Sequence, residues 1–221
     1  MALYIDSANL DDITAVAQTV PIAGVTTNPT LLLDARQRGQ QASVEEVISR
    51  LLQNVHGTIF LQPSIANEER AYRETMSYIQ IDPERVLAKI PMCKNGVRLG
   101  QRLHAEGQHI AFTAVTTVAQ AYMAAMVGAD YIIPYYNRLR RSGVDPCARI
   151  AQMAQVIGNR PTPTRILAAS IKSTAEAAEA LLSGAHDLTI PPAILLEMAT
   201  DPESEEAIER FERDSARMKN L

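Results

Sequence analysis

The sequence has little of what several classes of protein require. Its 221 residues include only two cysteines, Cys93 and Cys147, which are too few for a disulfide scaffold and match no metal-site spacing. No apolar run approaches the ~18 to 20 residues that span a bilayer. From Met1 the chain runs directly into the strand-like segment "LYID". We therefore expect a cytoplasmic protein with reduced thiols and no membrane partner.

A strong charge of one sign is also missing. The formal net charge is −4 and the pI is near 5.6, and no stripe of Lys and Arg is interleaved with aromatic residues. Such a chain has no basic field to attract a phosphate backbone, so we expect no nucleic-acid partner. The four histidines are scattered over unrelated segments, at 56, 104, 109 and 186. Because a metal ion needs clustered ligands, we expect no metal site.

What the sequence does contain is a regular alternation of short β-branched runs and longer segments of helical period. Eight strand–helix units in a chain of this size predict a (β/α)8 TIM barrel over residues 1–200, since crossover connections make the strands parallel and eight of them can close. The alternative is an open doubly wound sheet, which is disfavoured because "LYIDSANLDD" contains no glycine after the first strand. The expected strands are 3–5, 23–26, 58–61, 86–90, 109–113, 131–135, 165–169 and 188–190, and the expected helices are 11–18, 43–52, 68–79, 96–106, 117–127, 146–156, 174–183 and 193–198.

Residues 201–221 predict one more helix beyond the barrel. Glu206 with Arg210 and Glu209 with Arg213 have the spacing of helical salt bridges, and the apolar residues form only a narrow stripe. The pattern leaves open whether this helix packs on its own barrel or on a neighbouring subunit.

Polar residues gather at the carboxyl ends of the predicted strands, where barrels of this kind carry their chemistry. Each one alone also has a structural explanation, such as a helix cap or a turn. Their joint placement on one rim favours a functional site. These residues are Asp6, Thr26, Asn28, Gln62, Lys89, Thr113, Tyr135 and Ser170, with Arg138 and Lys172 just beyond the ends of two strands.

Lys89 is the most informative of these residues because lysine is rarely buried without a partner. A lysine amine can attack a carbonyl to form an iminium ion, but only in its neutral form, and an ordinary pKa of about 10.4 leaves well under ~1% neutral at pH 7. Burial among Val86, Leu87, Ala88 and Ile90 lowers that pKa. Lowering this pKa by about three pH units requires ~4 kcal/mol, which burial in an apolar barrel can supply. The pattern predicts Schiff-base aldol chemistry, with Asp6 and Tyr135 as the groups that can move protons.

The segments "LYIDSAN", "AGVTTNPT", "LAKIP", "PYYNR" and "ILAASIK" resemble the signature segments of the transaldolase family, and most closely its short branch, the fructose-6-phosphate aldolases. The resemblance runs through nearly the whole chain. It implies a (β/α)8 barrel, no cofactor, and ring-shaped decamers in which the C-terminal helix packs on a neighbouring subunit. It also implies dihydroxyacetone or a similar ketone as donor and glyceraldehyde 3-phosphate as acceptor.

The same resemblance assigns roles to individual residues. Lys89 would form the Schiff base and Asp6 would act as acid and base, while Tyr135, Gln62 and Thr113 would hold a catalytic water. Glutamine at 62 and tyrosine at 135 are typical of the aldolase branch, whereas transaldolases have glutamate and phenylalanine there. The remaining rim residues would bind substrate: Thr26, Asn28 and Ser170 in the pocket, and Arg138 and Lys172 at a sugar phosphate.

Two positions depart from the family pattern. Cys93 stands where the family usually has threonine, and Arg140 where it usually has an acidic residue. We expect the extra charge of Arg140 and Arg141 to affect the preference for acceptors. Two other functions remain open at this stage, a transaldolase that passes the three-carbon unit to a second aldose and a non-catalytic barrel that binds sugar phosphates.

Overall fold

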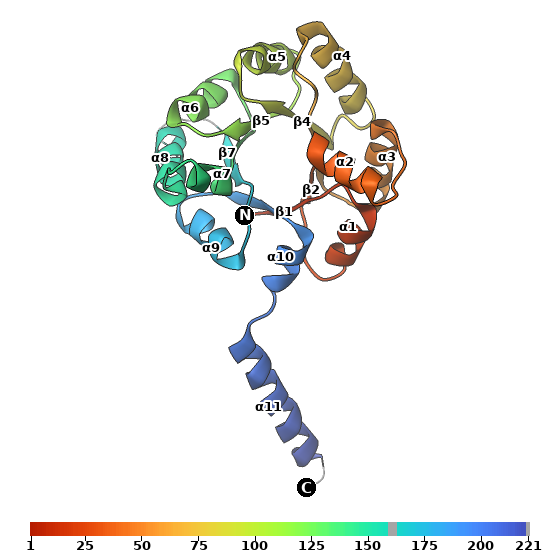
Figure 1. Ribbon diagram of the computed structural model, residues 1–221, viewed down its shortest axis with the longest axis vertical. Helices are drawn as coiled ribbons and strands as arrows, with labels where there is room; N and C mark the ends of the chain where they lie inside the picture. The colour runs from red at the N-terminus through yellow and green to blue at the C-terminus, as the bar shows by residue number, and fades with distance from the viewer. Residues whose placement is uncertain (159–162, 220–221) are drawn as a thin grey trace.

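Eight parallel strands close into a barrel in the computed structural model, which describes residues 1–158 and 163–219 (Figure 1). Neighbouring strands along the chain are neighbours in the barrel, and β1 pairs with β8 to complete it. The predicted (β/α)8 fold is confirmed, and the strand ends differ from the prediction by a residue or two. The strands are β1 (Leu3–Asp6), β2 (Gly24–Thr26), β3 (Thr58–Leu61), β4 (Val86–Pro91), β5 (Ile110–Val115), β6 (Tyr131–Pro134), β7 (Arg165–Ala168) and β8 (Asp187–Ile190).

Helices surround the barrel, as Figure 1 shows. Their ends carry the signals expected from the sequence: Ser43 and Glu46 form a capping box at the start of α3, and Gly107, Gly128 and Gly184 adopt positive φ where helices end. The helices that match predicted segments are α1 (Leu10–Ala17), α3 (Val44–Asn54), α4 (Glu68–Ile79), α5 (Lys94–Ala105), α6 (Val118–Val127), α8 (Pro146–Gly158), α9 (Thr174–Leu182) and α10 (Pro192–Glu197).

Two further helices were not predicted, and both lie at the rim of the barrel. In α2 (Pro29–Gln37) the three leucines are consecutive, so helical spacing is not visible in the sequence. Its start is nevertheless regular, with Asn28 as N-cap and Pro29 in the first turn. The other helix, α7 (Tyr136–Arg141), has six residues and is too short to show a period.

Side chains alternate between the inside and the outside of the barrel along each strand. On β4, Leu87 belongs to the apolar cluster inside the barrel, whereas Ala88 and Ile90 belong to the larger core between strands and helices. The inner cluster contains Tyr4, Phe60, Leu87, Ala111 and Ile133. Two residues after these stand Asp6, Gln62, Lys89, Thr113 and Tyr135, respectively. The inner apolar cluster therefore lies directly beneath the ring of polar residues at the carboxyl ends of the strands.

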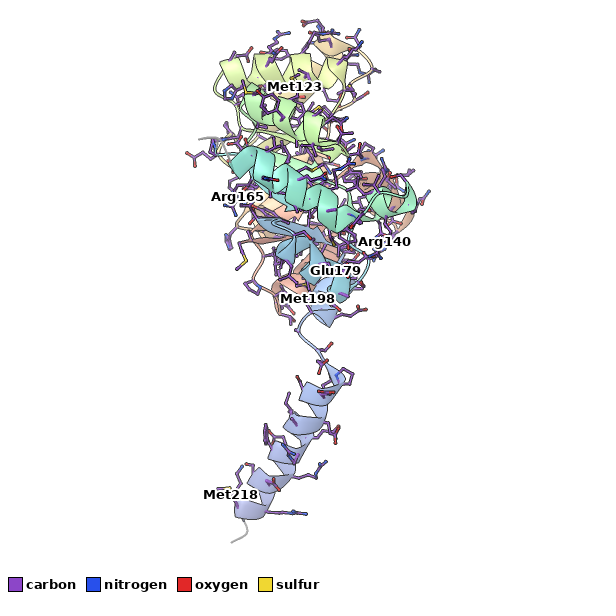
Figure 2. The ribbon with its side chains drawn as sticks, turned by 90° about the vertical axis from the view of Figure 1, so that its left-hand side faces the viewer. Met123, Arg140, Arg165, Glu179, Met198 and Met218 are labelled. Atoms are coloured by element: carbon purple, nitrogen blue, oxygen red, sulfur yellow. The ribbon has the colours of Figure 1, made fainter. Side chains whose placement is uncertain are left out.

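The last helix, α11 (Pro202–Met218), extends away from the barrel (Figure 1). From the side, Met218 lies at its far end, well separated from the remaining structure (Figure 2). None of the residues described in this helix is buried. It confirms the helix expected after the barrel, and residues 220–221 of the predicted range lie outside the described residues. Within the described chain no helix is long and apolar enough to cross a membrane.

Candidate active site

A cavity of about 140 Å³ opens at the carboxyl ends of the strands. Lys89 lines this cavity, directly above the inner apolar cluster that contains Leu87. Eight of the residues predicted from the sequence line this cavity, so strand ends far apart in the chain meet there as expected. They are Asp6, Thr26, Asn28, Lys89, Tyr135, Arg138, Ser170 and Lys172, and Ile133, Ala169 and Thr189 complete the lining.

The Lys89 side chain is buried, with 3% of the residue exposed. Its Nζ has no hydrogen-bond or ion-pair partner within the part of the chain that the structure describes. Burial lowers the pKa of Lys89 from 10.5 to about 8, although the negative charge of Asp6 raises it in part. At pH 7 about 10% of such an amine is neutral, some two orders of magnitude more than for an exposed lysine.

Asp6 is held by Thr26 of the neighbouring strand β2, which is in turn bonded to Thr189 of β8. Thr26 Oγ1 donates to Asp6 Oδ1 at 2.9 Å, and Thr26 and Thr189 share a hydrogen bond of 2.6 Å. Because the Thr26 hydrogen points to Asp6, Thr189 is the donor in the second bond. Burial raises the pKa of Asp6, opposed by the charge of Lys89, by the bond from Thr26 and by the charge of Lys172. The Asp6 carboxyl is thus fixed in orientation, and its pKa is raised above the ordinary value.

Tyr135 and Thr113 meet on the opposite side of the cavity. Their hydroxyls are 2.9 Å apart, and burial raises the pKa of Tyr135 while the bond with Thr113 opposes the shift. Thr113 and Gln62 line an adjoining cavity of about 360 Å³, which shares Asn28, Tyr135 and Arg138 with the first. Gln62 Oε1 is buried and has no partner among residues 1–158 and 163–219, so this acceptor is available to a bound hydroxyl.

Cations stand at the mouth of the cavity. Arg138 and Lys172 are both exposed residues that line it, and the Arg138 guanidinium lies 5.0 Å from the centre of the Tyr135 ring. Ser170 also lines the cavity and adopts a positive φ of 62°. Asn28 gives its Oδ1 to the first turn of α2, accepting from the backbone of Thr30 and Leu31. Two positive groups at one end of the cavity suit a dianionic phosphate.

The sequence analysis missed Thr189, which β8 brings to Thr26, the donor to Asp6. The signal was present, because Thr189 stands between Leu188 and Ile190 and therefore faces the opposite side of the strand from them. Among the residues that depart from the family pattern, Cys93 is the N-cap of α5, its Sγ accepting from the backbone of Gly96 at 3.3 Å.

Arg140, whose extra charge we expected to affect the preference for acceptors, lies outside the two cavities of the site. Its guanidinium is bound to Glu176 at 2.8 Å and lies 3.5 Å from Glu179, and neither cavity described above is lined by it. Figure 2 shows Arg140 and Glu179 on the same side of the molecule. The two carboxylates on α9 thus hold Arg140 away from the cavity mouth.

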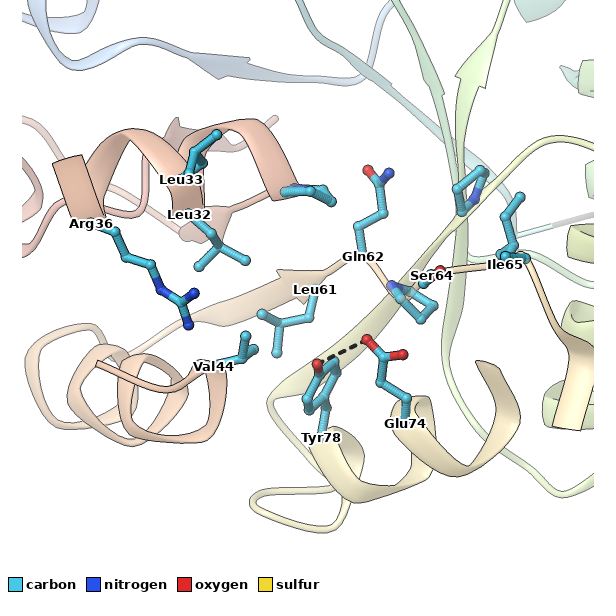
Figure 3. A pocket seen from close by; sticks show the side chains of 14 residues that line it. Leu32, Leu33, Arg36, Val44, Leu61, Gln62, Ser64, Ile65, Glu74 and Tyr78 are labelled. Carbon is cyan, nitrogen blue, oxygen red and sulfur yellow. Dashed lines mark hydrogen bonds between the residues drawn. The ribbon is translucent and has the colours of Figure 1, made fainter. Parts of the chain in front are cut away.

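A larger, mostly apolar groove of about 830 Å³ lies beside the site, between α2 and α4 (Figure 3). Leu32, Leu61 and Val44 line it, together with Gln62, which also lines the cavity of about 360 Å³. No group of three metal-ligating side chains occurs anywhere in the described residues. The groups available at this site are the buried amine of Lys89, the carboxyl of Asp6 and several hydroxyls, with two further cations at the mouth.

Solved structures with the same fold include proteins of different activity. The chain matches a candidate deoxyribose-phosphate aldolase from Coccidioides immitis with a TM-score of 0.63 and 14% identity, over 90% of this chain and 85% of that one. It also matches a mandelate oxidase variant with an FMN adduct, with a TM-score of 0.60 and 11% identity, over 87% and 65% of the two chains. At these identities the likeness shows the barrel alone.

The family comparison is more specific. Residues 3–221 match the family model described as transaldolase/fructose-6-phosphate aldolase. This match spans almost the whole chain and agrees with the resemblance found in its motifs. The protein therefore belongs to the transaldolase/fructose-6-phosphate aldolase family and is an enzyme of the aldolase or transaldolase type.

Proposed function

We propose that the protein is a class I aldolase that cleaves fructose 6-phosphate, or a related ketose phosphate, reversibly to dihydroxyacetone and glyceraldehyde 3-phosphate. The observation that carries this proposal is the buried amine of Lys89, which has no hydrogen-bond or ion-pair partner among the described residues and whose pKa is lowered to about 8. Such an amine is a nucleophile at neutral pH. Family membership supports a reaction of the aldolase or transaldolase type, whereas the identity of the substrate is our proposal.

In the proposed reaction the Lys89 amine adds to the ketone carbon, and loss of water gives an iminium ion. A base takes the proton from the hydroxyl on the carbon two positions from the iminium carbon. The bond that joins this hydroxyl-bearing carbon to the carbon next to the iminium then breaks, and its electrons neutralise the iminium to give an enamine. The aldehyde leaves at this stage. Protonation of the enamine and attack by water then release dihydroxyacetone and the free lysine. Asp6 is the proposed acid and base, because it lies in the same cavity and its pKa is raised.

The features beside the lysine favour an aldolase over a transaldolase. Release of dihydroxyacetone requires water to attack the iminium, so a site that holds water promotes cleavage, whereas a drier site lets a second aldose capture the enamine. The hydroxyl pair of Tyr135 and Thr113 and the free acceptor of Gln62 can hold and polarise such a water. Thr26, Asn28 and Ser170 are proposed to bind the sugar hydroxyls, and Arg138 and Lys172 the phosphate.

Two assays separate the aldolase from its alternatives. The first measures the dihydroxyacetone released from fructose 6-phosphate, and the second measures transfer of the three-carbon unit to erythrose 4-phosphate. An aldolase gives mainly release and a transaldolase mainly transfer. A barrel that only binds sugar phosphates gives neither product, and that result would refute the proposal.

We further propose that the enzyme acts in the cytoplasm as a homo-oligomer, a ring-shaped decamer by analogy with the aldolase branch, in which helix 201–221 packs on a neighbouring subunit. Ile208 is 57% and Phe211 60% exposed on α11. An isolated helix of this length is marginal in water, so its apolar face needs a partner. We also propose that residues 1–200 form a single barrel domain.

A further inference from the structure

One buried carboxylate of α9, that of Glu176, lies outside the cavities and has no part in the chemistry proposed above. Only 6% of the residue is exposed, and three donors surround its carboxylate. The backbone N–H of Lys172 donates to Oε2 at 2.7 Å and Asn137 Nδ2 donates to the same oxygen at 2.6 Å, while Arg140 Nη1 donates to Oε1 at 2.8 Å. A buried carboxylate is costly without such partners.

Helix capping does not account for these contacts. Ser173 caps α9 and accepts from the backbone N–H of Glu176, as in the first half of a capping box. In a complete box the glutamate side chain would return to the backbone N–H of Ser173. It bonds instead to the N–H of Lys172, one residue earlier, and to a side chain of α7. The carboxylate therefore connects two rim segments.

The first of these segments, 170–172, is held at both ends. Ser170 adopts a positive φ of 62°, which costs of order 1 kcal/mol or more for a residue other than glycine, so its surroundings must fix it. Asn137 does so by donating its side-chain amide to the Ser170 carbonyl at 3.1 Å, with a longer backbone bond of 3.3 Å. Glu176 accepts from the same amide nitrogen and from the other end of the segment at Lys172.

The second segment carries Arg138, the residue directly after Asn137. The backbone segments that carry the two cations at the cavity mouth, Arg138 and Lys172, are thus linked through a single carboxylate. Arg140 pairs with the remaining oxygen of that carboxylate, so the negative charge of Glu176 is compensated and competes less with a phosphate for Lys172.

We propose that Glu176 is a positioning residue that sets the spacing of Arg138 and Lys172 for the phosphate of the substrate. This inference rests on the proposed function, because it assumes that the two cations bind that phosphate. It gives the carboxylate a role in phosphate preference and none in the chemistry at Lys89.

The test compares Glu176→Gln with the control Glu179→Gln. Glu179 lies one turn further along α9 and also contacts Arg140, but within the described part of the chain it makes no hydrogen bond or ion pair with Asn137 or Lys172. For each protein kcat/KM is measured with glyceraldehyde 3-phosphate and with unphosphorylated glyceraldehyde, at saturating dihydroxyacetone. We expect Glu176→Gln to lower the value for the phosphorylated aldehyde about tenfold or more, mostly through KM, and that for glyceraldehyde less than about threefold. The control should change both by less than about twofold.

Two results would overturn the role of Glu176: an unchanged preference for the phosphorylated aldehyde, or an equal loss with both aldehydes, which is what a residue needed only for folding would give. If Glu176→Gln does not fold, Asn137→Ala cuts the same link from α7 and carries the same expectation. Failure of the proposed function would give a different result, because wild-type protein would then turn over neither aldehyde.

Discussion

Replacing Lys89 by methionine removes the ammonium group but keeps a side chain of similar length in the barrel. If burial lowers the pKa of Lys89 from 10.5 to about 8, the folded protein bears the cost of a charged amine in an apolar place at neutral pH. We therefore expect Lys89→Met to be more stable than wild type at pH 7, although it has lost the residue on which activity depends.

The magnitude and its pH dependence follow from those two pKa values. Below pH 8 the amine is protonated in both folded and unfolded chains, and the cost is constant at about 3 kcal/mol. Between pH 8 and 10.5 the unfolded chain binds more protons than the folded one, so wild-type stability rises with pH. The advantage of the variant should therefore fall to about half near pH 9 and to below about 0.5 kcal/mol by pH 10.5.

The assay is denaturant unfolding of both proteins at one protein concentration, from pH 6.5 to pH 10.5, with the free energies compared at each pH. Lys94→Met is the matched control, because it removes an exposed lysine of the neighbouring helix α5, and we expect it to change stability by less than about 0.5 kcal/mol throughout. A Lys89→Met difference that does not change with pH, or wild type as the more stable protein at pH 7, would contradict the assigned environment of Lys89.

Three further predictions concern activity and assembly. The kcat/KM for dihydroxyacetone should rise about tenfold per pH unit up to pH about 8 and then level off, because the neutral form of Lys89 is the nucleophile; a rise that continues past pH 10 would indicate an ordinary lysine. Tyr135→Phe should shift the products from release toward transfer to erythrose 4-phosphate, because it removes the hydroxyl paired with Thr113; an unchanged ratio would count against that hydroxyl. Phe211→Glu should dissociate the oligomer in sedimentation experiments, while a variant that sediments like wild type would exclude α11 from the interface.

The barrel and its rim could be predicted from the sequence because they depend on local patterns. The β-branched runs and capping residues mark the strands and helices, and parallel strands in a closed barrel bring their carboxyl ends together. Polar residues two positions after apolar inner residues, such as Lys89 after Leu87, could then be placed on one rim.

Features that depend on packing between distant segments were not predictable in this way. The short α7 has no visible period, and only its packing beside α9 brings Asn137 to Glu176. Arg140 looked like an extra charge for the substrate, because nothing in the sequence around it shows that Glu176 and Glu179 bind it. Thr189 was within reach of the sequence analysis, which considered the ends of the strands and overlooked an inward residue within β8.

Borohydride reduction in the presence of dihydroxyacetone tests the central claim most directly, because it makes an iminium adduct permanent at the nitrogen that formed it. Mass spectrometry of the intact protein and of its peptides then locates the adduct. The account predicts one adduct per chain, on the peptide that contains Lys89, and none in Lys89→Met. Wild-type protein without an adduct, or with the adduct on another lysine such as Lys172, would contradict it.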